Sequence, residues 1–340
     1  MKRINNSPEV PLPEPEAIDL QEVYASWERG EIDLVCVLGP TASGKTRYAV
    51  ALARELNRIS SEKNDLPLGS SVGAGTPFTV AKSCGVAEII SADSRQVYRG
   101  MDIGTGKDLD EYGEIPFHMI DIVDAGEKYD LYCYQRDFEA VYASVRERGH
   151  LPILCGGTGL YIQAVLSAYS LPDVPPSREL RSELEQTDIE ELREAYAERF
   201  GSKADPEVMV SKKRLIRALE VELSEGPVTR TSYEAKKAFI IGTLVSREER
   251  NFLIDKRLDQ RLESGLIEEV RSLLESGVGS DDLIYYGLEY KFVTQYLLGL
   301  IDKETMRLQL STAIHQFAKR QMTFFRSMES KGFRIHWTRP

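Results

Sequence analysis

The sequence lacks any run that approaches the roughly 20 consecutive apolar residues of a membrane span. Its opening residues, MKRINNSPEV, contain no apolar stretch that resembles the centre of a signal peptide. We therefore expect a cytoplasmic protein with no membrane association. With 340 residues, of which 42% are apolar, the chain is long enough for one main core and a smaller second domain.

Cysteine is also scarce. The four cysteines, Cys36, Cys84, Cys133 and Cys155, are scattered, with no C-x-x-C pair and no group of histidines near them. This spacing argues against a zinc site and against a disulfide framework. Cys36 and Cys155 lie inside apolar runs, and we expect both in the core.

An excess of positive charge is missing as well. The 43 lysines and arginines are outnumbered by 54 acids, which gives a net charge of −11. Binding of phosphate backbones requires clustered cations, so this balance argues against a large nucleic-acid surface. The charge is uneven, however, because residues 301–340 carry eight cations against three acids, whereas residues 178–200 are acidic. A local basic face is therefore compatible with the acidic chain.

Apolar runs of strand length alternate with stretches of helical periodicity. The predicted strands are residues 32–39, 87–93, 116–122, 150–157 and 238–245, and predicted helices include residues 44–56, 129–149 and 310–326. Such alternation predicts an α/β fold, in which helices cover both faces of a parallel sheet.

The composition also divides the chain. We expect a flexible N-terminal tail over residues 1–30 that ends in a short docking helix at LQEVYASWERG. A catalytic core over 31–170, a smaller helical insertion domain over 171–235, and the rest of the core with C-terminal helices over 236–340 are expected after it. Residues 58–85 are rich in serine and glycine, and we interpret them as a mobile insertion without chemistry.

The most informative short motif is GPTASGKT, which fits G-x-x-x-x-G-K-[ST] between a predicted strand and a predicted helix. Its glycines let consecutive N–H groups point inward at a helix N-terminus, where the dipole favours anions. Lys45 adds a charge at the terminal phosphate, and the Thr46 hydroxyl can hold Mg²⁺. The predicted phosphate-binding residues are Gly39, Pro40, Thr41, Ala42, Ser43, Gly44, Lys45 and Thr46. The loop predicts a P-loop NTPase-like core that binds a diphosphate or triphosphate, without identifying the reaction.

Polar residues follow two other predicted strands. Asp93 ends one strand and is followed by Ser94, Arg95 and Gln96, while Thr158 lies in the glycine-rich turn after another. Ligands of parallel sheets bind at the carboxyl ends of the strands, so we expect these residues around the phosphate loop. Asp93 has three possible roles: a magnesium ligand, a base that acts on an acceptor, or a cap of its own loop.

Together these segments resemble the bacterial tRNA dimethylallyltransferases, also called isopentenyltransferases. The motifs that carry the resemblance are GPTASGKT, EIISADSRQVYRGMDIGTGK, HMIDIVD, LPILCGGTGLYI, KRLIRALEV, HQFAKRQMTFFR and IHW, in family order between about residues 34 and 337. The family transfers a dimethylallyl group from its diphosphate to the exocyclic amine of the adenosine 3′ of the anticodon. The phosphate loop is then expected to hold the pyrophosphate of an isoprenoid, with Mg²⁺ and without a nucleotide.

The resemblance also implies residue roles. Residues 39–46 and Arg217 are expected on the diphosphate, Asp93 is expected to accept the amine proton, and Thr158 is expected to assist at the reacting end. The residues expected to contact tRNA are Asp93, Ser94, Arg95, Gln96, Thr158, Lys213, Arg214 and Arg217. The insertion at residues 171–235 corresponds to the part of the family that grips the anticodon arm.

One further cationic stretch lies in the predicted closing helix. The closing helix contributes Lys319, Arg320 and Arg326 as candidates for backbone phosphates, whereas its Phe and Met residues are expected in the core. The protein is expected to act as a monomer.

One segment departs from the family pattern. Where relatives usually read like Met-Arg-Ala-Ile-Gly-Tyr, this chain has LIYYGLEYKF. Tyr285, Tyr286 and Tyr290 can either stack on bases or belong to the core. The departure leaves the donor chemistry intact and concerns the RNA contacts.

Other functions fit parts of the sequence. An adenylate isopentenyltransferase would act on free AMP, ADP or ATP, although the long C-terminal half and the basic closing helix favour tRNA. A small-molecule kinase would hold ATP in the phosphate loop, but DSRQVYRGMDIGT has no role there. A nucleotide-dependent switch or RNA-binding module would bind ATP without dimethylallyl transfer.

Overall fold

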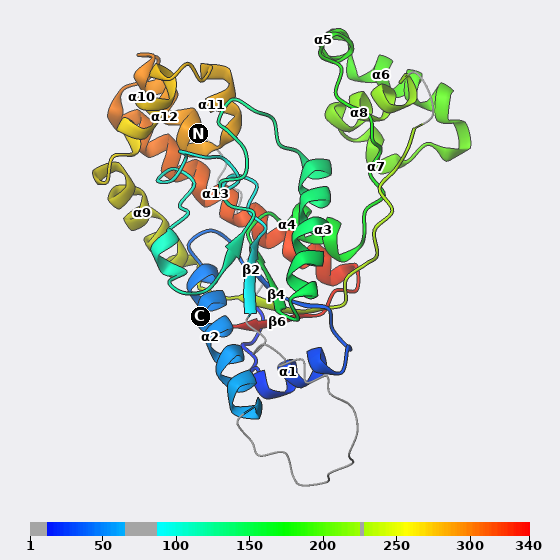
Figure 1. Cartoon of the computed structure of the whole chain (residues 1–340). Coiled ribbons are helices and arrows are strands. Elements are labelled where there is room, and N and C mark those ends of the chain that lie inside the picture. The colour runs from blue at the N-terminus through cyan, green and yellow to red at the C-terminus, as the bar shows by residue number, and fades with distance from the viewer. Residues whose placement is uncertain (1–11, 65–86, 225–227) are drawn as a thin grey trace. The chain divides into compact units, whose positions relative to one another are not determined.

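The computed structural model describes residues 12–64, 87–224 and 228–340, which form two compact units (Figure 1). Unit 1 comprises Met1–Ser167 and Ala235–Pro340, and unit 2 comprises Ala168–Glu234. We expected the insertion over residues 171–235 from the sequence. In the described parts of the chain, no helix is both long and apolar enough to cross a membrane.

Unit 1 is built around one six-stranded parallel sheet. Its strands are β1 (Leu34–Leu38), β2 (Ala87–Ser91), β3 (Phe117–His118), β4 (Leu151–Gly156), β5 (Ala238–Thr243) and β6 (Ile335–Thr338). They lie in the order β3-β2-β4-β1-β5-β6, and every neighbouring pair is parallel. The predicted α/β fold with a parallel sheet is therefore confirmed.

The strand predicted over residues 116–122 was wrong in length. Only Phe117 and His118 pair with β2, opposite Ile89 and Ile90. Met119 has φ 65° and Asp121 has φ 55°, and this left-handed backbone cannot continue a strand.

Both faces of the sheet are covered, which explains why β1 is apolar at every position. Val35 and Val37 point to a core shared with α1 (Leu20–Glu28) and α2 (Lys45–Asn64). Leu34 and Cys36 point to the opposite core, shared with α3 (Leu131–Glu147), α4 (Gly159–Leu166) and α13 (Lys303–Ser330). Cys36 and Cys155 are both buried, as expected.

The C-terminal part of unit 1 is helical. Its remaining helices are α9 (Arg247–Glu263), α10 (Leu266–Glu275), α11 (Ser280–Tyr286) and α12 (Leu288–Leu297). Unit 1 also contains a 3-10 turn between β2 and β3, at Leu109–Glu111. In Figure 1, α13 (orange to red) runs from the group formed by α10, α11 and α12 back along the sheet. This long helix brings residues from the end of the chain to the carboxyl edge of the strands.

The interpretation of residues 58–85 needs correction at its start. Helix α2 does not end near residue 57 but continues to Asn64. Ile59 and Ser60 are buried there, and the Tyr24 hydroxyl of α1 donates to the Ser60 hydroxyl at 2.9 Å. Residues 65–86 lie outside the described residues, as do residues 1–11 of the expected N-terminal tail.

Unit 2 is a small helical domain. It contains α5 (Arg178–Gln186), α6 (Ile189–Phe200), a 3-10 turn (Gly201–Lys203), α7 (Pro206–Met209) and α8 (Lys212–Glu222). Its core is formed by Leu192, Tyr196, Leu215, Ile216 and Leu219. The core is small, and α6 and α8 supply all of these buried side chains.

Candidate active site

A cavity of about 530 Å³ lies in unit 1, where the segments after β1, β2 and β4 come together. This is the carboxyl edge of the parallel sheet, the usual place for a ligand in such folds. Among the residues predicted from the sequence, the cavity wall contains Thr41, Lys45, Thr46, Asp93, Ser94, Arg95, Gln96 and Thr158. The rest of the wall comes mainly from residues 104–106 and from α9, α11, α12 and α13.

The phosphate loop is shaped by close backbone contacts. Ala42 and Gly44 have φ of 59° and 72°, which curls the chain before α2 begins at Lys45. The Ser43 hydroxyl lies 2.6 Å from the Thr243 hydroxyl on β5. A Cβ atom at Gly39 would lie 2.0 Å from the Thr243 hydroxyl oxygen, so only glycine fits there. Pro40 is buried behind the loop.

A glutamine of α13 connects the phosphate loop to the turn after β4. The Thr41 N–H donates to the Gln321 side-chain oxygen at 2.8 Å, and the Gln321 amide nitrogen donates to the Gly157 carbonyl at 2.8 Å. Gln321 is only 8% exposed, so both of its polar ends are engaged inside the protein. Gln321 lies in the segment HQFAKRQMTFFR, but sequence reasoning gave it no role, because a local motif does not show which distant residues a side chain contacts.

Asp93 both caps its own loop and faces the cavity. Its Oδ1 atom accepts the Arg95 N–H at 2.9 Å, which is the capping role considered from the sequence. This contact uses one carboxylate oxygen and fixes the orientation of the group. Asp93 also lines the cavity, so its carboxylate borders the space in which a ligand can bind.

Thr158 holds the segments after β2 and β4 together. The Ser94 N–H donates to the Thr158 hydroxyl at 3.0 Å, and that hydroxyl lies 3.3 Å from the Ser94 hydroxyl. The Thr158 N–H donates to the Ala92 carbonyl at 3.1 Å. Thr158 is also the N-cap of α4. The two segments predicted to meet at the site are therefore bonded directly.

Gln96 has internal partners at both ends of its amide. Its nitrogen donates to the Gly106 carbonyl at 3.1 Å, and its oxygen accepts the Ser91 hydroxyl at 3.0 Å. The side chain is 8% exposed. The structure thus gives Gln96 a place in supporting the cavity wall, and its predicted contact with RNA stays a prediction.

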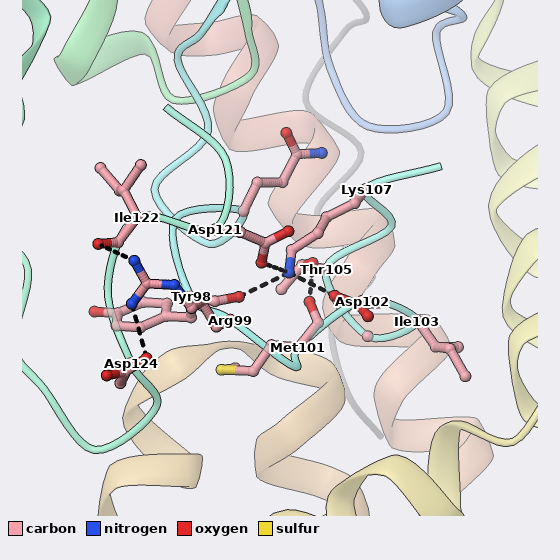
Figure 2. Close-up of polar contacts among 12 residues, drawn as sticks. Tyr98, Arg99, Met101, Asp102, Ile103, Thr105, Lys107, Asp121, Ile122 and Asp124 are labelled. Carbon is pink, nitrogen blue, oxygen red and sulfur yellow. Dashed lines mark hydrogen bonds and ion pairs between the residues drawn. The ribbon is translucent and has the colours of Figure 1, made fainter. Parts of the chain in front are cut away.

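The glycine-rich segment after Tyr98 is held from two sides. Figure 2 shows the buried Lys107 ammonium at the centre of one cluster, where it donates to the Tyr98 carbonyl at 2.7 Å and to Asp102 at 2.6 Å and also pairs with Asp121. From the other side, Glu269 of α10 accepts the N–H groups of Asp102, Ile103 and Gly104 at 2.8, 2.7 and 3.0 Å. These contacts fix the backbone of residues 104–106, which lines the cavity.

Two arginines of α9 add positive charge beside the phosphate loop. Arg257 and Arg261 line the cavity together with Lys45. Arg257 lies 2.5 Å from Asp108, and Arg261 lies 3.2 Å from Glu289. Desolvation lowers the pKa of Lys45, and the nearby Asp93 carboxylate opposes this effect. Neither arginine was predicted from the sequence.

A second cavity of about 730 Å³ meets the first at the phosphate loop. The two cavities share Lys45, Thr46, Arg257 and Arg261. Ala42 and Gly44 face only the second one. The cationic centre of the site can therefore be reached from two sides, one of which also contains Asp93.

The remaining sequence-predicted cations lie in unit 2 and on α13. In unit 2, Lys213 and Arg214 are exposed, and the Arg217 guanidinium donates to Glu220 at 2.6 Å and to the Val174 carbonyl at 2.9 Å. Their predicted contacts with tRNA, and that of Arg217 with the diphosphate, stay predictions.

On α13, Lys319 and Arg320 are exposed, and Arg320 lines the first cavity. The prediction that the Met and Phe residues of this helix are core holds for Met322 and Phe325, which are buried, but not for Phe317, which is 39% exposed.

The sequence left open whether the tyrosines of LIYYGLEYKF belong to the core or are placed to stack on bases, and the three residues differ in this respect. Tyr286 and Tyr290 are core residues, each 1% exposed, whereas Tyr285 is 50% exposed at the cavity. The Tyr290 hydroxyl donates to Glu269 at 2.7 Å.

The fold places a phosphate loop and a carboxylate in the wall of one cavity, an arrangement typical of enzymes that transfer a group from a phosphorylated donor. The sequence matches the family described as IPP transferase over residues 96–328. It is 46% identical to "tRNA dimethylallyltransferase 2" of Bacteroides fragilis over 90% of this chain and 92% of that protein. It is 49% identical to "tRNA dimethylallyltransferase 1" of Porphyromonas gingivalis over 89% of this chain and 93% of that protein.

Solved structures agree with this relationship. The tRNA isopentenylpyrophosphate transferase of Bacillus halodurans superposes with a TM-score of 0.59 at 31% identity, covering 90% of this chain and 89% of that one. A eukaryotic dimethylallyltransferase acting on tRNA shares the fold, with a TM-score of 0.60 at 21% identity over 86% of this chain and 69% of that one. The chain belongs to the IPP transferase family.

Proposed function

We propose that this enzyme transfers the dimethylallyl group of dimethylallyl diphosphate to the exocyclic amine of the adenosine 3′ of the anticodon in tRNA. The products are N6-isopentenyladenosine and pyrophosphate. The observation that carries the proposal is that Asp93, Thr158 and Lys45 line one cavity. The names of relatives with 46% and 49% identity, which describe action on tRNA, support the choice of acceptor.

The donor diphosphate is assigned to the phosphate loop. Its oxygens would accept backbone N–H groups of residues 42–46, before and at the start of α2, where the helix dipole favours an anion. Pro40 has no N–H, and the Thr41 N–H already donates to Gln321. Lys45, Arg257 and Arg261 line the same space and would stabilise the negative charge that develops on the leaving pyrophosphate. Breaking the allylic carbon–oxygen bond transfers its electron pair to this pyrophosphate.

Mg²⁺ fits this site as an ion held mainly by the substrate. The Thr46 hydroxyl lines both cavities beside Lys45. Within the described ranges, no group of three or more His, Cys, Asp or Glu side chains is arranged to hold a metal. Mg²⁺ commonly binds through substrate phosphates, water and one or two protein oxygens, so Thr46 would suffice as the protein ligand. The ion would add positive charge at the bond that breaks.

Asp93 is assigned to the acceptor. An adenine amine is a weak nucleophile, because its lone pair is delocalised into the ring. As the new carbon–nitrogen bond forms, Asp93 would accept the amine proton through the oxygen not used by the Arg95 N–H. Such base catalysis contributes roughly 10²–10⁴-fold to the rate. The Thr158 hydroxyl would lie beside the reacting end. To reach this cavity, the adenosine must leave its stack.

The RNA-binding residues follow from charge and position. Ser94 and Arg95 would contact the flipped adenosine and its neighbours, with Gln96 behind them. Unit 2 would grip the anticodon arm and place Lys213, Arg214 and Arg217 near backbone phosphates. We assign the enzyme to the cytoplasm and expect it to act as a monomer.

A transfer assay tests the proposal. Radiolabelled dimethylallyl diphosphate and Mg²⁺ are offered with unmodified tRNA, AMP or ATP as the acceptor. Label in tRNA alone supports the proposal, whereas label in AMP or ATP alone would make the enzyme a free-nucleotide prenyltransferase. Hydrolysis of ATP without any transfer would instead indicate a kinase or a nucleotide switch.

The Asp93→Asn variant tests the chemistry. The amide oxygen of asparagine can still accept the Arg95 N–H, so the loop should keep its shape. We expect kcat to fall by roughly 10²–10⁴-fold while donor affinity is retained. Unchanged turnover in this variant would remove Asp93 as the base.

A further inference from the structure

Tyr285 is an aromatic side chain at the opening of the cavity. It lines the cavity but is 50% exposed, whereas its neighbours Tyr286 and Tyr290 are buried. Half of the Tyr285 side chain is therefore open to a ligand. The ring offers a flat apolar face beside Asp93, which lines the same cavity.

The ring is supported by rigid neighbours. The Tyr285 ring meets the Tyr286 ring edge-on, with the two ring centroids 6.1 Å apart and the ring planes at 68°. The Tyr286 hydroxyl accepts the Gly126 N–H at 2.7 Å and donates to the Glu127 carbonyl at 2.8 Å. Tyr286 also packs on the buried Tyr98 with centroids 4.3 Å apart. Tyr285 is therefore carried by a fixed part of the core, at the last turn of α11.

Arg95 places a flat cation next to this ring. Its guanidinium carbon lies 5.5 Å from the centroid of the Tyr285 ring, within the range of a cation–π contact. Arg95 lies two residues after Asp93, and the Asp93 carboxylate accepts its N–H. Arg95 therefore connects the Tyr285 ring, which its guanidinium contacts, to the proposed base Asp93, which accepts its N–H.

The surroundings favour an anionic, aromatic ligand. Besides Arg95, the cations Lys291 and Arg320 line the cavity. A flat apolar face among cations is the arrangement that binds unpaired nucleotides, whose bases stack on aromatic rings while their phosphates meet positive charge. An apolar peptide would not use these cations.

We propose that Tyr285 and Arg95 form a stacking platform for an unpaired base next to the reacting adenosine, and that this platform selects RNA substrates by the base at that position. The inference rests on the proposed function, because it takes Asp93 as the point where the adenosine reacts. Purines present the larger stacking surface and are the preferred bases. Tyr285 is then a specificity residue for RNA, with no part in donor binding.

The test compares anticodon stem-loops that differ only beside the target adenosine. Each flanking position carries a purine, a pyrimidine or an abasic sugar in turn. The native enzyme and the variants Tyr285→Ala, Tyr285→Phe and Tyr285→Trp are assayed for kcat and for the KM of RNA and of donor. Phe252→Ala serves as the control, since Phe252 is an exposed aromatic residue of α9 outside the cavity wall (65% exposed).

We expect Tyr285→Ala to raise the KM for RNA roughly tenfold, the size of one lost base–aromatic stack, with kcat and donor KM unchanged. The rise should vanish when the stacked position is abasic, and the Phe and Trp variants should keep native values. The platform would be overturned if Tyr285→Ala raised the KM equally for every abasic RNA, or if it raised the KM for no RNA.

A binding measurement without donor separates this inference from the proposed function. Fluorescence anisotropy of labelled stem-loops should show the same loss for Tyr285→Ala as the KM values do. If native enzyme and variant bind the stem-loop equally, the platform fails even when transfer to tRNA is observed. If native enzyme transfers no label to any stem-loop, the proposed function fails, and the anisotropy still decides whether Tyr285 binds RNA.

Discussion

Two carboxylates with different surroundings lie near the two ends of strand β2, Glu88 on the strand and Asp93 after it. Glu88, near its start, is 3% exposed and accepts two hydrogen bonds from Arg148, at 3.0 and 2.8 Å. It also contacts His118, at 2.5 Å, and His150. Asp93 follows the carboxyl end of the same strand at the cavity. We predict that Glu88→Gln reduces stability without changing the chemistry.

The size of this effect follows from the Glu88 pKa. Burial alone would raise it, but hydrogen bonds from Arg148, His118 and His150 lower the pKa from its ordinary value of 4.5 to about 2. A pKa difference of one corresponds to about 1.4 kcal/mol, so ionised Glu88 stabilises the fold by about 3 kcal/mol at pH 7. Because the folded pKa is the lower one, this stability is present above pH 4.5 and is lost as the pH falls towards 2. About 1 kcal/mol should remain at pH 3.

Urea unfolding at several pH values measures this directly. The difference in unfolding free energy between the native protein and Glu88→Gln should be about 3 kcal/mol at pH 7 and about 1 kcal/mol at pH 3. The turnover of folded Glu88→Gln should match that of the native enzyme, in contrast to Asp93→Asn. A difference that is the same at both pH values would refute the ionised, hydrogen-bonded carboxylate as its source.

Two further predictions concern the geometry of the diphosphate site. Gln321→Ala removes the two hydrogen bonds by which this side chain connects the phosphate loop to Gly157, each worth about 1 kcal/mol. We expect the donor KM to rise by roughly 5- to 30-fold, with the RNA KM unchanged. An unchanged donor KM would show that these hydrogen bonds do not position the phosphate loop. Gly106→Ala places a Cβ atom 1.6 Å from the Arg261 guanidinium at φ +61°, so it should displace both α9 arginines and weaken donor binding. Gly100→Ala is the matched control, because Gly100 has φ +70° with nothing within 4 Å, and equal donor KM values in the two variants would show that backbone strain alone is responsible.

The parts of the site that sequence could predict are those encoded by local patterns. The phosphate loop is identified by glycine spacing between a strand and a helix, and Asp93 and Thr158 by their positions after apolar runs. Gln321 and Arg261 gave no such signal. Gln321 lies 280 residues from Thr41 in the chain, and only the path of α13 places them in contact. Such pairs depend on the tertiary arrangement, which periodicity does not contain.

The tyrosine segment shows why the alternatives could not be separated from sequence alone. Successive residues of a helix point about 100° apart, so Tyr285 and Tyr286 can face different surroundings. Which of them faces the core depends on the orientation of α11, and this orientation is fixed by distant contacts of Tyr286 with Gly126 and Glu127. The extended φ of 163° at Gly287 then separates α11 from α12, where Tyr290 turns inward.

The contacts of Glu269 help to explain where the donor diphosphate must bind. Three consecutive N–H groups, of Asp102, Ile103 and Gly104, point at one carboxylate, an arrangement that would otherwise attract a phosphate. Because Glu269 already accepts all three, these groups are satisfied inside the protein and add negative rather than positive charge beside the cavity. The phosphate loop with the cations Lys45 and Arg257 is then the position that we propose for pyrophosphate. The same carboxylate fixes the backbone of the segment that forms another part of the cavity wall, so the proposed site is preorganised in the protein without a bound substrate.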